Sequence, residues 1–177
     1  MRIKYETVPI LTTFDFNLAT SFAWDNCRFH LTNTTKEALG NLVTGGWPGL
    51  VMRAVDREVT VGGLPLVVGY SWYVASCYSG GSSATCVREG YRGHGIGMTL
   101  FAKKIGYVVA HDDRPEHMRR IPVYIAGDNV RSIRMFHGAL REYPELSRYV
   151  TLHLGRNHDS EGSKVQLPKN RGIEQDE

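Results

Sequence analysis

Apolar residues along this chain fall into short blocks with either strand-like or helix-like spacing. Strands are expected where apolar residues alternate or run together for a few positions, and helices where they recur every three or four residues. The first pattern predicts strands at residues 2–8, 50–55, 66–75, 83–87, 121–126 and 149–154. The second predicts helices at residues 14–30, from Thr34 to the Gly45-Gly46 pair, 96–110 and 129–141.

The connections between these blocks indicate a topology. Residues 56–65, which contain Gly62-Gly63, are expected to join two strands as a hairpin loop. Residues 83–126 have the order strand, loop, helix, strand, a crossover that predicts two neighbouring parallel strands. We therefore expect a single α/β (α+β) domain, with a mixed central sheet of about six to seven strands flanked by helices.

The composition agrees with one globular domain, since 42% of the 177 residues are apolar. The expected domain covers residues 1–154. The polar residues 155–177 contain too few large apolar side chains to offset the entropy of ordering, which predicts a disordered tail. No apolar stretch reaches the roughly 18 residues of a membrane helix, and Met1–Tyr5 lacks the apolar region of a signal peptide.

Charge and cysteine content narrow the function classes further. The formal net charge of +3 is too small to indicate nucleic-acid binding by itself. Cys27, Cys77 and Cys86 are odd in number and lack CxxC spacing, which predicts reduced thiols in a cytoplasm rather than a disulfide framework. The histidines show neither HxH nor HxxxH spacing, so no metal site is expected.

The sharpest motif is the glycine-rich segment Tyr91–Gly97, between a predicted strand and a predicted helix. Three glycines in five positions allow a tight turn and a close approach of backbone N–H groups to a ligand. The first amides of the following helix and its dipole favour an anion at the same place. The segment therefore predicts a pyrophosphate cradle, with Arg92 adding a positive charge.

Other interpretations of this segment are weaker. A glycine-rich turn that only permits tight packing of strand and helix would not need the arginine. The dinucleotide-binding pattern GxGxxG does not fit, because the glycines stand at alternate positions, and no GK[ST] follows as in a Walker loop.

The run from Val87 to Gly97 resembles the acyl-CoA signature of the GNAT superfamily of N-acetyltransferases. The family's loop, Arg/Gln-x-x-Gly-x-Gly/Ala, is matched by Arg92, Gly95 and Gly97. The chain departs from the family where Glu89 replaces the usual proline. A second family element, an asparagine after the next strand with a small residue three positions later, is matched by Asn129 and Ser132.

The resemblance implies an acetyl-CoA site without a metal. In this family acyl-CoA enters where the strand before the loop splays from the next strand. The backbone of Cys86 and Val87 would pair with the pantetheine arm, and the Val87 amide would polarise the thioester carbonyl. Asn129 would hydrogen-bond the arm. The implied cofactor-binding residues are Cys86, Val87, Arg92, Gly93, His94, Gly95, Ile96, Gly97, Asn129 and Ser132.

The residues that would move protons are not assigned by the sequence. The family often has a tyrosine seven residues after the asparagine, which protonates the leaving thiolate, but Phe136 occupies this position. His137 and Tyr143 are the nearest replacements, each with an equally good structural interpretation. Asp128 could act as a base, although a helix N-cap is the better interpretation. Cys86 is expected to be a small core residue rather than a nucleophile.

On the acceptor side, the resemblance directs attention to the loop between the first two helices and to the late strands. Asp25, Asn26, Trp47 and Glu142–Glu145 fall in such segments, and their acidic side chains would suit a cationic amine. The acceptor could be a small-molecule amine or a protein amine. No membrane partner is expected, and a dimer is compatible with the sequence, which does not decide the oligomeric state.

Two functions of different classes remain open. The first is an N-acetyltransferase that moves an acetyl group from acetyl-CoA to an amine by direct attack. The second is a GNAT-fold module that binds CoA or another protein with little or no turnover, as the missing tyrosine at Phe136 allows. A nucleotide phosphate-binding module is a weaker third interpretation.

Overall fold

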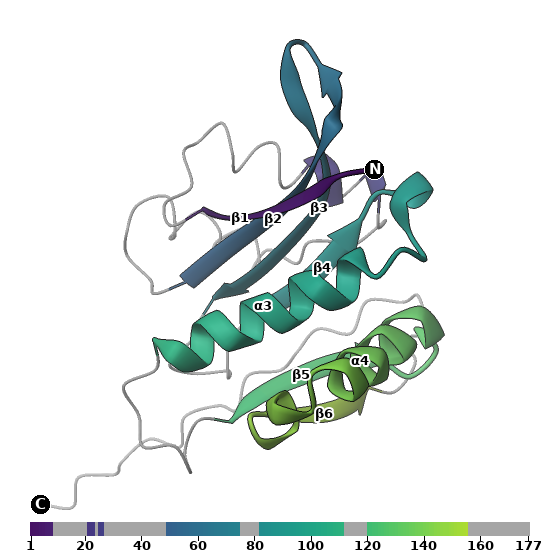
Figure 1. Ribbon diagram of the computed structural model, residues 1–177. Helices are drawn as coiled ribbons and strands as arrows, with labels where there is room; N and C mark the ends of the chain where they lie inside the picture. Colours follow the sequence, from purple (N-terminus) through teal and green to yellow (C-terminus); the bar gives the residue numbers. More distant parts are fainter. Residues whose placement is uncertain (9–20, 24, 27–48, 75–81, 112–119, 156–177) are drawn as a thin grey trace, which may run out of the picture.

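The computed structural model describes residues 1–8, 21–23, 25–26, 49–74, 82–111 and 120–155 (Figure 1). The predicted helix at Thr34, the residue Trp47 and the tail from residue 156 lie outside these ranges. Of the predicted helix 14–30, only residues 21–23 and 25–26 are described, and they are helical. Among the described residues, no helix combines the length and apolar character needed to cross a membrane.

The first half of the described chain forms an antiparallel four-stranded sheet in the order β1-β2-β3-β4. These strands are β1 (Ile3–Val8), β2 (Gly49–Val61), β3 (Leu64–Val74) and β4 (Ser82–Val87). The hairpin loop expected at residues 56–65 is much shorter, because only Gly62 and Gly63 separate β2 from β3. Both glycines have positive φ, 60° and 79°, so a two-residue turn closes the hairpin and the strands extend to it.

The second half forms a two-stranded parallel sheet from β5 (Ile121–Ala126) and β6 (Val150–Gly155). Helix α4 (Val130–Glu142) and the short 3-10 helix η3 (Pro144–Arg148) connect the two strands. The predicted α/β fold class is confirmed. The prediction that the two strands within residues 83–126 pair with each other is wrong. The parallel partner of β5 is β6, and β4 and β5 belong to different sheets rather than to one mixed sheet.

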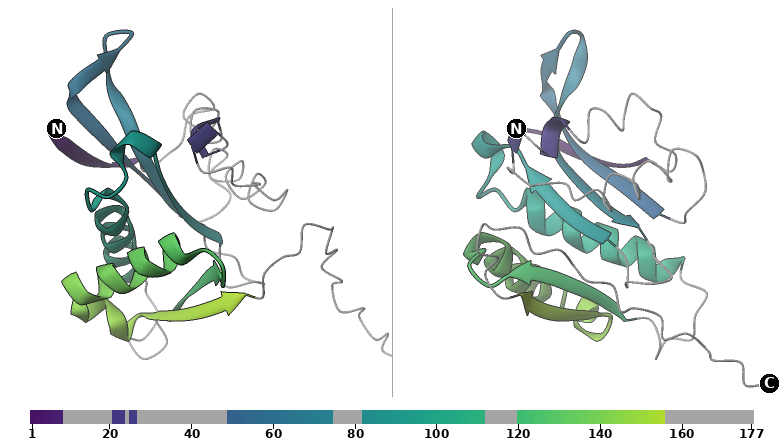
Figure 2. Two further views of the ribbon diagram at one scale, coloured as in Figure 1. Left: turned by 90° about the vertical axis from the view of Figure 1, so that its right-hand side faces the viewer. Right: turned by 180° about the vertical axis from the view of Figure 1, so that it is seen from behind.

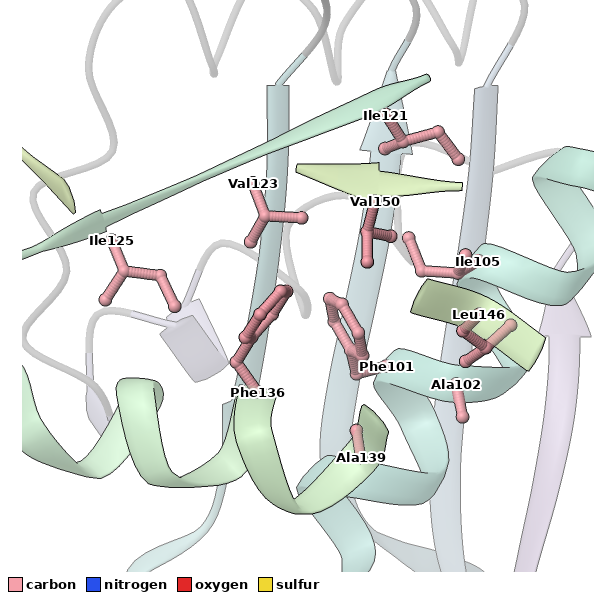
Figure 3. Packing of buried hydrophobic residues seen from close by; sticks show 10 residues of the cluster. All are labelled: Phe101, Ala102, Ile105, Ile121, Val123, Ile125, Phe136, Ala139, Leu146 and Val150. Atoms are coloured by element: carbon pink, nitrogen blue, oxygen red, sulfur yellow. The ribbon is translucent and has the colours of Figure 1, made fainter. Parts of the chain in front are cut away.

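Helix α3 (Ile96–Ala110) joins the two sheets by packing against both. Leu100 lies in the apolar cluster under the four-stranded sheet, while Phe101 and Ile105 lie in the cluster under β5 and β6 (Figure 3). The helix approaches β3 closely at Gly69, where an added Cβ would lie 2.9 Å from Leu100 Cδ1. One face of α3 therefore contributes to both hydrophobic cores.

Cys86 on β4 is disulfide-bonded. The other two cysteines, Cys27 and Cys77, lie outside the described residues. The expectation of reduced thiols is wrong for Cys86, because spacing along a sequence does not reveal which cysteines a fold brings together. Reduced cysteines therefore no longer support the prediction of a cytoplasmic protein.

Candidate functional site

Strand β4 forms the edge of its sheet and exposes alternate backbone groups there. Arg88, directly after β4, lies opposite Val68 on β3, and its N–H donates to the Val68 carbonyl at 2.9 Å. Arg88 and Val68 are therefore a hydrogen-bonded pair of the antiparallel ladder. Because hydrogen-bonded pairs alternate in an antiparallel ladder, Val87 and Thr85 direct their N–H and C=O groups away from β3. Cys86 directs its own toward β3, so its backbone does not serve a ligand at the free edge.

The chain leaves β4 through the 3-10 turn η1 (Glu89–Tyr91) and then reaches α3 through the glycine loop. Gly93 and Gly95 have φ values of 83° and 76°, the left-handed region that glycine adopts without strain. Gly95 is the N-cap residue of α3, and no side chain of the described residues caps this helix. The N–H groups of its first turn, from Ile96 to Met98, also have no partner within the helix.

The glycine loop therefore presents an amide-rich helix N-terminus suited to an anion. The Arg92 amide is not part of it, since it donates to the Glu89 carbonyl at 3.1 Å. Ile96 contributes only its backbone, because its side chain is buried in the core. His94 is exposed at the surface of the loop.

The Arg92 side chain ties the loop to two other segments. Its Nε donates to the Val87 carbonyl at 3.0 Å, and one Nη donates to the Asn26 carbonyl. These two donors are therefore engaged with protein carbonyls, and the guanidinium contributes positive charge beside the end of β4. The contact also brings Asn26, one of the residues expected on the acceptor side, next to the glycine loop.

Tyr91 anchors the other side of the loop to the first sheet. Its hydroxyl donates to the Asp56 carboxylate at 3.2 Å, and the Asp56 side chain is only 2% exposed. The backbone N–H groups of Glu58 and Arg2 donate to the same carboxylate. Hydrogen bonding, first of all from the Glu58 amide, holds the pKa of Asp56 below its usual value, whereas burial and Asp56 raise the pKa of Tyr91.

Asn129 and Ser132 lie at the N-terminus of α4, close to the glycine loop. Asn129 is the N-cap residue, and its Oδ1 accepts a hydrogen bond from the Ser132 amide at 3.1 Å. The capping role expected for Asp128 thus belongs to Asn129, whose side chain accepts from the Ser132 N–H in the first turn of the helix. An added Cβ at Gly97 would lie 3.5 Å from Met135 Cγ, so the first turn of α3 is next to the second turn of α4.

The residues considered as proton donors have different surroundings. Phe136 is buried against Phe101, with ring centroids 5.7 Å apart. His137 is exposed on the outside of α4. Tyr143 follows the last residue of α4, at the end of this helix opposite to Asn129.

The structure separates the two groups of residues expected on the acceptor side. In the parallel register Val150 is opposite Ile121, so the chain around Glu142–Glu145 meets the amino end of β5. Asn129 follows the carboxyl end of the same strand, and a six-residue strand is about 20 Å long. Glu142–Glu145 therefore lie far from the glycine loop, whereas Asn26 contacts it.

Three further residues, which the sequence analysis did not select, have surroundings that bear on the site. Tyr124 on β5 and His153 on β6 stack, with ring centroids 4.9 Å apart, and Tyr124 is 64% exposed. Their neighbours Val123 and Ile125 belong to the core between the sheet and α4, so the stacked pair occupies the opposite sheet face. Figure 2, right, shows the ribbons of β5 and β6 with α4 behind them. The alternation of apolar and other residues along each strand could have placed Tyr124 and His153 on an outward face. It could not have shown that the two residues lie opposite each other.

The third is Lys104, a lysine on the apolar stripe of α3. Its side chain is only 1% exposed, and burial lowers the pKa of its ammonium to about 7. The available signal was a charged residue directly before Ile105, on the helix face expected to be apolar. Within the described part of the chain, no three His, Cys, Asp or Glu side chains gather as metal ligands would.

Comparisons with known proteins support the fold. No family model matches the chain, and no curated protein matches it in sequence. Among solved structures, the chain is similar to the N-acetyltransferase NAA60 of Arabidopsis thaliana in complex with a bisubstrate analogue, at a TM-score of 0.50 and 18% identity. The match covers 76% of this chain and 82% of that one. At this identity the likeness shows the fold alone, and the described residues have the fold of a GNAT-like domain.

Proposed function

We propose that this protein is an acetyl-CoA-dependent N-acetyltransferase. The observation that carries the proposal is the uncapped N-terminus of α3, reached through two glycines of positive φ directly after an edge strand. This arrangement offers several backbone donors to one diphosphate. The likeness of the fold to NAA60 supports the same activity.

The pyrophosphate of the donor would lie on the amides from Gly93 to Met98. From there the pantetheine arm would run back along the outer edge of β4. It would meet first the Val87 N–H, since the Val87 carbonyl accepts from Arg92, and then Thr85. We propose Thr85 in place of Cys86 as the second backbone partner, because the Cys86 groups face β3. The Nδ2 amide of Asn129 would donate to the arm, since its Oδ1 is occupied by the helix cap.

The reaction needs an amine in its neutral form, a positioned thioester and a donor for the developing oxyanion. The Thr85 N–H, the deeper of the two edge amides, would polarise the thioester carbonyl. Nitrogen attacks the carbonyl carbon, the carbon–sulfur bond breaks, and CoA leaves as a thiolate. No residue needs to carry the acetyl group.

The proposed donor site lies between the outer edge of β4 and β5, and we call this site the wedge. The acceptor would approach it from the sheet face that carries Tyr124 and His153. An aromatic surface suits an ammonium group through cation–π attraction. The bisubstrate analogue in NAA60 supports a site where donor and acceptor are bound together. Asn26 would lie on the opposite side of this entrance, beside the glycine loop.

Titration calorimetry with CoA, acetyl-CoA and ATP tests the proposal. We expect saturable binding of both CoA forms and none of ATP. Thiol release from acetyl-CoA, measured over a panel of small and peptide amines, then tests the transfer step. Binding without thiol release for any amine would favour the CoA-binding module. Absence of CoA binding would rule out the acetyltransferase and the CoA-binding module, and leave a protein-interaction module.

A further inference from the structure

Lys104 lies at the inner side of the proposed wedge, where α3 packs against β4. Its Nζ is 3.5 Å from the Ala84 carbonyl oxygen. The Ser71 hydroxyl donates to the same carbonyl at 3.1 Å and lies 2.8 Å from the Thr85 hydroxyl. The ammonium therefore belongs to a polar cluster at the peptide between Ala84 and Thr85.

The same ammonium is close to the position where the GNAT resemblance expects a tyrosine. Lys104 Nζ lies 5.2 Å from the centroid of the Phe101 ring, and the Phe101 ring packs on Phe136. Phe136 occupies the tyrosine position and has no proton to donate. The Phe101 ring thus separates the Lys104 ammonium, which can donate a proton, from Phe136, which cannot.

The depth of Lys104 in the wedge suits the thiol end of the donor. Ala84 precedes Val87 by three residues, or about 10 Å of extended strand. Lys104 follows the start of α3 by eight residues, or about 12 Å of helix. An arm that begins at the glycine loop and follows β4 inward would therefore bring its sulfur toward Thr85 and Lys104.

We propose that Lys104 protonates the CoA thiolate as it leaves, in place of the tyrosine. This inference rests on the proposed acetyltransferase function. As the carbon–sulfur bond breaks, its electron pair stays on sulfur, and the Lys104 ammonium transfers one proton to that sulfur. The nitrogen that has become an amide gives up one proton, which restores the ammonium through water.

The electrostatics of the site agree with this role. Burial lowers the pKa of Lys104 to about 7, so both protonation states are accessible near neutral pH. Among the described residues of the apolar cluster that contains Phe101, the titratable side chains are the phenols of Tyr73 on β3 and Tyr143 after α4.

The ionisation of bound CoA tests the inference without an acceptor. In the reverse of the proposed step, the thiol of bound CoA passes its proton to the Lys104 amine. Ultraviolet absorbance of the thiolate, followed against pH, gives the apparent pKa of the bound thiol. We expect this pKa to be lower in the wild type than in Lys104→Met by about 1 to 3, the effect of an opposite charge at close range.

Lys103→Met is the matched control, because Lys103 is the exposed neighbour and its Nζ lies 5.9 Å from the Tyr5 ring centroid, away from β4. It should leave the thiol pKa unchanged. Methionine fills a similar volume without a charge, so Lys104→Met should fold, and Lys104→Gln provides a second variant of that position.

The outcomes separate the two proposals. An equal thiol pKa in the wild type and in both Lys104 variants, each with CoA bound, would overturn the role of Lys104 and leave the acetyltransferase function standing. Absence of CoA binding to the wild type would overturn the function and the inference with it. Once an acceptor is known, Lys104→Met should lower kcat about 100-fold with little change in KM for acetyl-CoA.

Discussion

At the scale of single residues, Asp56 connects the first sheet to the glycine loop. Its buried carboxylate accepts hydrogen bonds from the amides of Arg2 and Glu58 and from the Tyr91 hydroxyl. A carboxylate with three donors is strongly stabilised in its ionised form. The loop that would hold the diphosphate therefore depends on a residue 39 positions before Gly95 in the chain.

We expect Asp56→Asn to lower the melting temperature at neutral pH, because an amide replaces the charged acceptor of these hydrogen bonds. The pKa of Asp56 is lowered in the folded protein, so its contribution is present above the ordinary value of 3.8 and is lost as pH falls through the folded value. The difference between variant and wild type should therefore shrink below about pH 4. Thermal unfolding across pH measures it, and a constant difference would contradict this assignment.

Gly95 is the residue whose backbone torsion matters most for the proposed cradle. Its φ of 76° strains any β-branched side chain, although an added Cβ would meet only Met98 Cε at 3.7 Å. We expect Gly95→Val to weaken CoA binding at least about tenfold, as 1–3 kcal/mol of backbone strain implies. Gly90→Ala is the control, because a Cβ there has nothing within 4 Å. Calorimetry that finds equal affinities for both variants would remove the loop from the site.

At the scale of secondary structure elements, the N-terminus of α4 combines two roles in one residue. Asn129 caps the helix with its Oδ1 and, in the proposed function, offers its Nδ2 to the pantetheine arm. The N-terminus of α3 is the reverse case, since it has no side-chain cap. Two neighbouring helix starts therefore differ: the Asn129 side chain caps α4, whereas among the described residues no side chain caps α3.

The two roles of Asn129 can be separated by substitution. Asn129→Ala should cost about 1 kcal/mol of stability through loss of the cap, whereas Asn129→Ser should keep most of it. Both variants lack the amide donor, so both should bind CoA more weakly than the wild type. Chemical denaturation and calorimetry on the same samples measure the two effects. Wild-type CoA affinity in Asn129→Ser would mean that Asn129 serves only the helix.

At the scale of the whole molecule, α3 makes the two sheets one folding unit. β4 and β5 share no hydrogen bonds in the described ladders, and in the described part of the chain the two sheets are joined by packing on α3. Leu100 and Ile105 belong to different apolar clusters but to the same helix. A single rigid helix thus couples the glycine loop, the edge of β4 and the start of α4.

We expect Leu100→Ala and Ile105→Ala each to destabilise the protein by about 2–5 kcal/mol, since both side chains are fully buried. Because α3 belongs to both cores, each variant should still unfold in a single transition. Differential scanning calorimetry tests this expectation. Two separate transitions in either variant would show that the sheets unfold independently.

Much of this molecule follows from local patterns. The strand at residues 121–126 has the predicted bounds, and α3 covers the predicted residues 96–110. Both are short segments whose apolar spacing is unambiguous. The predicted hairpin loop at residues 56–65 is wrong because β2 continues to Val61 and β3 begins at Leu64. The ends of these strands are exposed, and a pattern of buried residues does not reveal exposed strands.

Some features of the candidate site could be predicted from local sequence and others could not. The glycines of the loop were recognised because positive φ and small size are properties of the residue itself. The edge groups of Thr85, the cap made by Asn129 and the burial of Lys104 were not, because each depends on a partner distant in sequence. Register along β4 in particular decides whether residue 85 or residue 86 faces a ligand.

The amino-acid order alone thus determined where the chain turns, which segments carry an apolar face and where an anion can meet a helix start. Those properties depend on torsion preferences and on spacings of a few residues. The tertiary structure alone decided that β5 pairs with β6, that Cys86 is oxidised and that Lys104 lies beside β4. Such outcomes depend on which distant surfaces exclude water together, and no local spacing contains that information.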